Sequence, residues 1–274
     1  MIQIDPNIEK FLQDNVQLME DENYDKLYEQ ALTQNEFKVS ELTQFLWDCG
    51  IHPELEGLTE IPKKFAQGLK VMTAPIPVGI TSIGKLAFSD CTSLTSIDIP
   101  KSVESIGGQA FSLCSSLTSV TIPSSVKSID YGVFYGCASL PLVVIPDSVT
   151  SIGKLTFCEC SSLTSVTFDG GSRCASIERH AFARCFSLTS IAIPDKVESI
   201  GEYTFARCTS LTSITISSGV KSIGEGVFHS CTSLKEIIFE GTKEQWGAIS
   251  KGRDWKKYVR GLVVYCKDGE VKYR

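Results

Sequence analysis

The sequence predicts a repeat solenoid, a right-handed coil with a parallel β-sheet on its concave face. Short helices precede the coil and a small α/β cap follows it. Three residue types recur in phase: a phenylalanine every 23 residues with one step of 25, a cysteine three residues later, and a leucine three residues after that. A fixed period in the twenties is the signature of a solenoid. The positions are Phe88, Phe111, Phe134, Phe157, Phe182, Phe205 and Phe228; Cys91, Cys114, Cys137, Cys160, Cys185, Cys208 and Cys231; and Leu94, Leu117, Leu140, Leu163, Leu188, Leu211 and Leu234.

The repeat divides the chain into four predicted parts. These are a helical N-terminal cap domain (1–57), a degenerate first repeat (58–78), an array of seven repeats (79–240) and a C-terminal cap of a helix plus a hairpin (241–274). Asp5 and Pro6 suit the start of a helix, and apolar residues follow at helical spacing. They are Ile8, Phe11, Leu12, Val16 and Met19 in the first helix, with two further helices around Leu27 and Leu42. The alternative for these helices is an independent binding domain.

Each repeat contains one predicted strand, which is Leu94-x-x-Ile97-x-Ile99 in the first repeat, with its large side chains inward. Val103, Ile106, Phe111 and Cys114 are then expected to turn the coil and fill it. A proline ends the strand at Pro100, Pro123, Pro146 and Pro194. A glycine after an isoleucine is expected to permit a tight backbone turn at Gly84, Gly107, Gly153, Gly201 and Gly224. The step of 25 residues comes from residues 169–172, which should bulge as a turn.

The C-terminal segment departs from the repeat. Thr242-Lys-Glu-Gln245 has the form of a capping box and predicts a short helix that contains Trp246 and Ile249. Residues 263–266 and 270–273 flank Lys-Asp-Gly and predict a hairpin. Together these elements would seal the far end of the core.

The repeated motif resembles that of a known family. Ile-Pro-x-Ser-Val-x-Ser-Ile-Gly-x-x-Ala-Phe-x-x-Cys-x-Ser-Leu-Thr-Ser-Ile is similar to the BspA-type leucine-rich repeat, a 23-residue class found in bacteria and some parasitic protists. Residues 123–137 and 146–160 match nearly word for word, with Asp130 in place of a glycine, and 241–246 are similar to the tail of such arrays. The resemblance implies a leucine-rich-repeat fold without catalytic residues. Such proteins are often surface proteins implicated in adhesion to host proteins or to other cells.

The charge distribution limits the classes of partner. The net charge of −6 argues against nucleic acid as a partner. The first sixty residues carry three basic and fourteen acidic side chains, and the last thirty-four carry nine basic and four acidic. A monomer is expected, and the alternative is a structural protein that self-assembles by contact of its acidic head with its basic tail.

No membrane insertion is expected, because no apolar run reaches the ~18–20 residues of a spanning helix. Without a visible export signal or wall anchor, the sequence as given predicts a cytoplasmic protein. A removed signal would make it a cell-surface or secreted protein instead.

The cysteines in the repeats predict a ladder of free thiols. Equivalent Cβ atoms on neighbouring strands lie ~4.8 Å apart, beyond the usual ~3.5–4.5 Å of a disulfide. A zinc site of Cys158, Cys160, Cys174 and Cys185 is disfavoured, because two of the four belong to the ladder. No metal or cofactor is expected, and Cys158 is the cysteine expected to be exposed and modifiable.

No enzyme is predicted. The sequence offers no set of acid, base and nucleophile. His52, His180 and His229 lie far apart in the sequence, and they are interpreted as solvated surface residues because His180 and His229 fall at the edges of coils.

The candidate binding site is the row of side chains that point outward between the leucine and the two isoleucines. The candidate residues are Ser96, Asp98, Ser119, Thr121, Leu142, Val144, Ser165, Thr167, Ser190, Ala192, Ser213 and Thr215, and the row continues with Glu236 and Ile238. Most of these side chains are small, neutral and hydroxylated, but Leu142 and Val144 are apolar. An apolar spot on a polar surface marks a contact, so we expect a non-enzymatic module that binds a protein there. The alternative is that the third repeat has diverged in sequence at these positions without consequence for binding.

Overall fold

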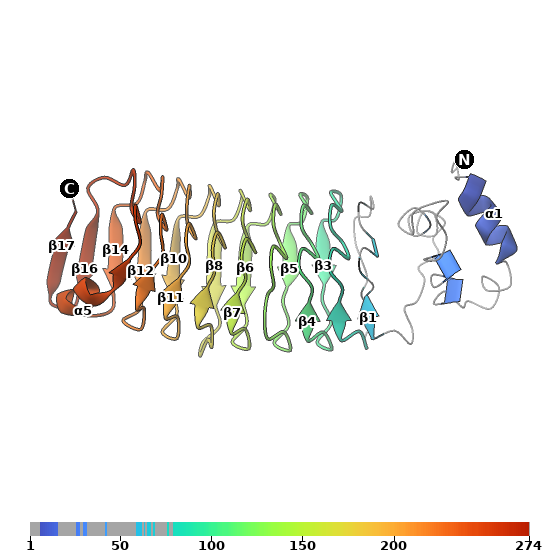
Figure 1. Cartoon of the computed structure of the whole chain (residues 1–274), viewed down its shortest axis with the longest axis horizontal. Helices are drawn as coiled ribbons and strands as arrows, with labels where there is room; N and C mark the ends of the chain where they lie inside the picture. Colours follow the sequence, from blue (N-terminus) through green and yellow to red (C-terminus); the bar gives the residue numbers. More distant parts are fainter. Residues whose placement is uncertain are drawn as a thin grey trace.

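The computed structural model describes residues 6–15, 26, 27, 30, 31, 42, 59–61, 63, 65, 66, 68, 76 and 79–273. Within these residues the chain forms a rod of stacked coils, with helix α1 (Pro6–Asp14) at the N-terminal end (Figure 1). Ile8 and Phe11 of α1 are buried, as its apolar face predicts, and so are Leu27 and Leu42. Ala31, which also predicts the second helix, is buried too. The remaining apolar residues that predict the second and third helices lie outside the described residues.

The predicted parallel strands of the seven repeats are confirmed. They are β3 (Ser96–Asp98), β5 (Ser119–Thr121), β6 (Leu142–Ile145), β8 (Ser165–Phe168), β10 (Ser190–Ile193), β12 (Ser213–Ile216) and β14 (Glu236–Phe239). The predicted hairpin strand β16 (Val263–Cys266) adds an eighth parallel strand after β14. These strands pair in the groups β3–β5, β6–β8 and β10–β12–β14–β16. In β6 and β10 exposed residues alternate with buried ones, which places one side of each strand in the core.

A proline accounts for the separation of β5 from β6. In neighbouring coils the backbone N–H before the strand donates to the preceding coil, as from Thr118 to the Thr95 carbonyl at 2.8 Å. Pro141 occupies this position before β6 and has no N–H to donate. The hydrogen-bond ladder is therefore interrupted at the start of β6.

A second parallel sheet of two-residue strands runs beside the first. It comprises β1 (Glu60–Ile61), β2 (Ser82–Ile83), β4 (Ser105–Ile106), β7 (Ser151–Ile152), β9 (Ser176–Ile177), β11 (Ser199–Ile200), β13 (Ser222–Ile223) and β15 (Ser250–Lys251). Isolated bridges from Ile129 to Ile106 and Ile152 join the two halves. These isoleucines were predicted only to turn and fill the coil. Two residues are too few to show the alternation by which a strand is recognised.

The recurring phenylalanines and cysteines join successive coils in the core. The rings from Phe88 to Phe228 stack with centroids 5.4–5.9 Å apart and planes within 10° of parallel. Each thiol from Cys114 to Cys231 donates to the carbonyl of the phenylalanine in the preceding coil, at 2.9–3.2 Å. All ten described cysteines are free, which confirms the predicted ladder of thiols.

The degenerate first repeat continues this stack where it is described. Phe65 meets the Phe88 ring edge-on at 6.2 Å, and the Cys91 thiol donates to the Ala66 carbonyl at 2.9 Å. β1 pairs with β2 in the same register as the later coils.

The role of the recurring glycines differs from the prediction. The left-handed residues of a coil are those two before and two after the phenylalanine, such as Gln109 (φ 59°) and Leu113 (φ 60°). Gly153, by contrast, has no positive φ, but a Cβ there would lie 2.7 Å from the carbonyl carbon of Asp130 in the preceding coil. The glycine is therefore required by the close approach of two backbones, not by a turn. The bulge predicted at residues 169–172 is confirmed as a turn, in which Ser172 N–H donates to the Asp169 carbonyl.

The C-terminal segment does more than cap the array. Helix α5 (Lys243–Ala248) begins at Thr242 with both bonds of the predicted capping box. β15 and β16 then extend both sheets by a further coil, and β17 (Gly269–Lys272) pairs antiparallel with β16 and ends the sheet. Trp246 is buried, and its Nε1–H donates to the Tyr273 hydroxyl at 3.0 Å. Aromatic rings thus close the end of the core.

The glycine contact leads to a stability prediction. Gly153→Ala should lower the free energy of unfolding by about 1–3 kcal/mol, because its methyl group forces two coils apart. Gly170→Ala is the matched control: Gly170 lacks a positive φ and has nothing within 4 Å of its added Cβ. It should change stability by no more than about 0.5 kcal/mol. Denaturant unfolding of both variants measures the difference, and equal stabilities would contradict the account.

Candidate functional site

The structure places the predicted binding residues on the solvent side of the longer strands. We call this surface the strand face and define it by the exposed positions of β3, β5, β6, β8, β10, β12, β14 and β16. Register brings the predicted residues together in pairs: Ser96 with Ser119, Asp98 with Thr121, Leu142 with Ser165, Val144 with Thr167, Ser190 with Ser213, and Ala192 with Thr215. The residues therefore share a surface, and its use for binding stays a prediction.

Strand β6 carries the apolar spot that the sequence predicts. The Leu142 side chain is 55% exposed and that of Val144 is 43% exposed, although both are hydrophobic. Val143 and Ile145, which alternate with them, are buried in the core. Strand β6 is thus apolar on both faces. Only its inward face packs in the core, so the core does not account for the apolar residues on the outward face.

A second apolar spot lies farther along the strand face. Ile238 on β14 and Tyr265 on β16 are 45% and 43% exposed, and their Cα atoms are register partners. Ile238 was predicted to point outward but was not among the candidate binding residues, and Tyr265 was predicted only as part of the terminal hairpin. The alternation around buried Val264 would have identified Tyr265 as an outward position.

The histidines lie in an aromatic row at the turns rather than singly on the surface. The His180 and Tyr203 rings stack at 5.3 Å, and His229 lies between Tyr203 and Tyr258 at 6.3 and 5.1 Å. Both histidines are partly buried. Burial, and then the charge of Arg179, lower the pKa of His180, so its ring is neutral at pH 7. His52 lies outside the described residues.

The cysteines proposed as alternative zinc ligands are used elsewhere. The thiols of Cys160 and Cys185 donate to phenylalanine carbonyls, and that of Cys174 donates to the Ser176 carbonyl at 3.4 Å. No group of three or more His, Cys, Asp or Glu side chains in the described part of the chain is placed to hold a metal ion.

The self-assembly alternative rests largely on the acidic head of the chain. Most of the acidic side chains of residues 1–60 lie outside the described residues. Head-to-tail contact therefore stays a prediction from charge alone.

Cys158 is not the exposed thiol that the sequence analysis expected. Its side chain is only 5% exposed, in a small cluster with Ala183 and Ala206 that Tyr135 and Leu155 cover. Burial, and then the charge of Glu159, raise the pKa of Cys158 to about 12. The prediction was wrong because side chains of the adjacent turns fold over a position that does not face the core.

The burial of Cys158 leads to a prediction about which thiols react. Cys266 is partly exposed, although burial also raises its pKa. Iodoacetamide at pH 8 should label Cys266 at least about ten times faster than Cys158, because a thiol with a pKa near 12 holds almost no thiolate there. Mass spectrometry of the labelled peptides gives the two rates, and the denatured chain serves as the control in which they converge. Comparable rates in the native protein would contradict the burial of Cys158.

Comparisons with known proteins identify the repeats. The model of the BspA-type leucine-rich repeat region matches residues 59–170 and 127–249, with six copies. A leucine-rich cell surface protein from Faecalibacterium prausnitzii is 33% identical with a TM-score of 0.50, covering 71% of this chain and 61% of its own. The pneumococcal vaccine antigen PcpA is 21% identical with a TM-score of 0.51, covering 76% and 60%. This chain thus spans about three fifths of either protein's length.

Two further comparisons are negative. No curated protein shows significant similarity to the sequence. None of the helices in the described residues combines the length with the hydrophobicity that spanning a membrane takes.

Proposed function

Because this chain belongs to the BspA-type leucine-rich repeat family, we propose that it is a binding protein that holds a protein partner on its strand face. The observation that carries the proposal is the exposure of Leu142 and Val144, side by side on β6. Adjacent apolar side chains exposed on an otherwise polar surface are a feature of protein interaction sites. The partner would bury both side chains.

The surroundings of this pair suit a docking surface. Ser165 and Thr167 lie beside Leu142 and Val144 in register, and their hydroxyl groups can donate and accept hydrogen bonds. Charged side chains are rare along the strand face; Asp98 and Glu236 are the acidic ones at its outward positions. Recognition would therefore depend on shape, apolar contact and neutral hydrogen bonds more than on ion pairs.

We further propose that the partner is a protein of a host or neighbouring cell, so that binding is adhesive. The similar Faecalibacterium prausnitzii protein, which is a leucine-rich cell surface protein, supports this proposal. The stacked coils support binding in general, because a preorganised surface loses little conformational entropy on binding.

The strand-face proposal predicts the effect of a double substitution. Leu142→Asp with Val144→Asp should weaken capture of a matrix or cell-surface protein at least about tenfold, because two charges would have to be buried in the interface. Capture by the immobilised protein would be measured by surface plasmon resonance against a panel of purified extracellular-matrix and cell-surface proteins. Far-ultraviolet circular dichroism and the unfolding midpoint would verify that the variant folds.

The matched control places the same charges elsewhere on the strand face. Ser190→Asp with Ala192→Asp alters two exposed positions of β10, two strands away from β6. Because β10 belongs to the strand face but lacks the apolar pair, this variant should lose several-fold less affinity than the Leu142/Val144 variant. An equal loss of affinity in both variants would show that the binding site extends over the whole strand face. Unchanged capture by the folded Leu142/Val144 variant would show that the site does not include β6.

A further inference from the structure

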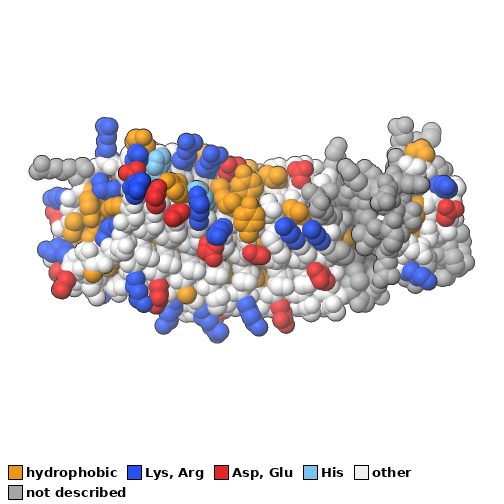
Figure 2. All heavy atoms as spheres, in the orientation of Figure 1, with side chains coloured by type: hydrophobic (Ala, Val, Ile, Leu, Met, Phe, Trp, Pro, Cys, Tyr) orange, Lys and Arg blue, Asp and Glu red, His pale blue; other side chains and the backbone are white. Residues whose placement is uncertain are grey.

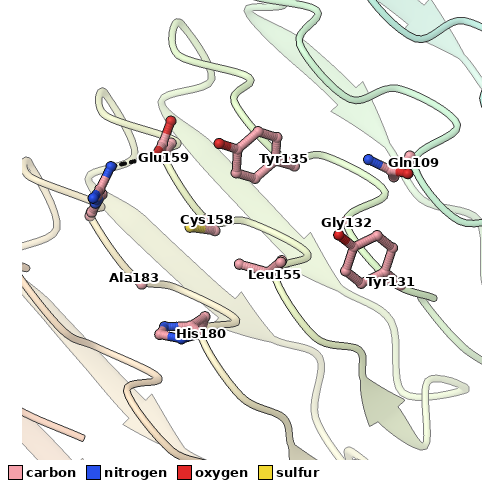
Figure 3. Close-up of a pocket in the computed structure, with 10 residues that line it drawn as sticks. Gln109, Tyr131, Gly132, Tyr135, Leu155, Cys158, Glu159, His180 and Ala183 are labelled. Carbon is pink, nitrogen blue, oxygen red and sulfur yellow. Dashed lines mark hydrogen bonds and ion pairs between the residues drawn. The ribbon is translucent and has the colours of Figure 1, made fainter. Parts of the chain in front are cut away.

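A groove of about 470 Å³ opens at the turns of four successive coils, away from the strand face. Figure 3 shows its lining, in which Tyr135 and Glu159 stand on one side of Cys158, and Leu155 and His180 stand on the other. Figure 2 shows hydrophobic side chains gathered on one face of the rod, beside histidine side chains. The volume lies within the range of small-ligand sites, roughly 300–1,000 Å³.

The groove combines one departure from the repeat with one feature that most coils share. Two residues before the phenylalanine, a left-handed residue projects a side chain from the turn, as at Gln109, Leu155 and His180. Gly132 occupies this position in the third coil and projects nothing. One residue after the phenylalanine, Cys158 and Ala183 are small and buried, so they form a low apolar floor.

Polar groups of balanced charge line the sides. The Glu159 carboxylate accepts a hydrogen bond from Arg184 Nη1 at 2.6 Å. Burial, and then the charge and hydrogen bonding of Glu159, raise the pKa of Tyr135, so its phenol stays protonated and lies against that carboxylate. Across the groove stand the Gln109 amide and the Tyr131 ring, which is 42% exposed. The ionised groups of the lining cancel, because His180 is neutral at pH 7.

This combination of groups indicates a class of ligand. A charged ligand would have to compete with the Glu159–Arg184 pair, and a wholly apolar one would leave the polar groups of the walls unpaired. A ligand with an apolar C–H face and several hydroxyl groups fits both the apolar and the polar surfaces of the groove. Its C–H face can cover the tyrosine and leucine side chains. Its hydroxyl groups can form hydrogen bonds with the carboxylate, guanidinium and amide groups. We propose that the groove between Tyr131 and Arg184 binds a neutral saccharide.

The test uses sugars as probes and two matched substitutions. Saturation-transfer NMR with the methyl glycosides of glucose, galactose, mannose and N-acetylglucosamine should show saturable binding of at least one. Ala183→Met, which puts a longer side chain onto the floor, should weaken that binding at least about tenfold. Ala206→Met is the control, because Ala206 occupies the same position one coil farther on, outside the groove. It should leave binding unchanged.

Two further variants keep the outcome decisive. Glu159→Gln preserves the shape of the wall but removes its charge, and it should weaken binding several-fold even if Ala183→Met fails to fold. The Leu142→Asp and Val144→Asp variant should bind the sugar normally, so this proposal can fail or hold independently of the strand-face proposal.

Three results would overturn the saccharide site. One is the absence of saturable binding by all four glycosides. Another is binding that the folded Ala183→Met and Glu159→Gln variants leave intact. The third is tighter binding of glucuronic acid, glucosamine or N-acetyltyrosinamide than of the neutral sugars. Glucuronic acid represents an anionic ligand and glucosamine a cationic one. N-acetyltyrosinamide represents an aromatic side chain of a partner protein.

Discussion

Successive coils are joined by backbone hydrogen bonds, as from the Phe111 N–H to the Val133 carbonyl at 2.9 Å, and by the carbonyl group of one phenylalanine in each coil. That oxygen accepts the thiol hydrogen of the next coil's cysteine, as from Cys160 to Phe134 at 3.2 Å, while the phenylalanine rings stack beside it. One such contact is worth little, about 0.5–1.5 kcal/mol for a stacked aromatic pair and less than a usual hydrogen bond for a thiol. Repetition in every coil makes the array rigid, and the missing Cβ of Gly153 lets the backbones approach. All other side-chain columns are positioned by this spacing.

The constraint separates positions that must repeat from positions that are free to vary. Inward positions keep their residue type because a change would disturb two neighbouring coils at once. Outward positions on the strand face and at the turns lack this restriction, so departures there signal function more clearly than departures in the core. On the strand face, Leu142 and Val144 place apolar side chains in a row that is mostly polar. At the turns, Gly132 lacks the side chain that other coils project two residues before the phenylalanine. The two proposed sites are local departures of opposite kind on one scaffold.

Much of the fold was predictable, because the period of 23 residues identifies which residues stack. The phenylalanine and cysteine columns, the longer strands and the capping box at Thr242 were all derived from spacing. The short Ser-Ile strands were missed because two residues show no alternation. The left-handed turns were misassigned to glycines, because non-glycine residues such as Gln109 adopt them. The exposure of Leu142 followed from alternation along one strand, whereas the cover over Cys158 and the groove beside it depend on side chains of three or four coils, which spacing does not reveal.

Hydrogen–deuterium exchange of the chain with and without a captured matrix or cell-surface protein tests the central claim most directly. Exchange at residues 139–168 should slow in the complex, because this segment includes β6 and β8 around Leu142 and Val144. Peptides from the turns around Gly132 and His180 should exchange as in the free chain. Protection confined to those turns, or to the C-terminal coil after α5, would contradict docking on the strand face.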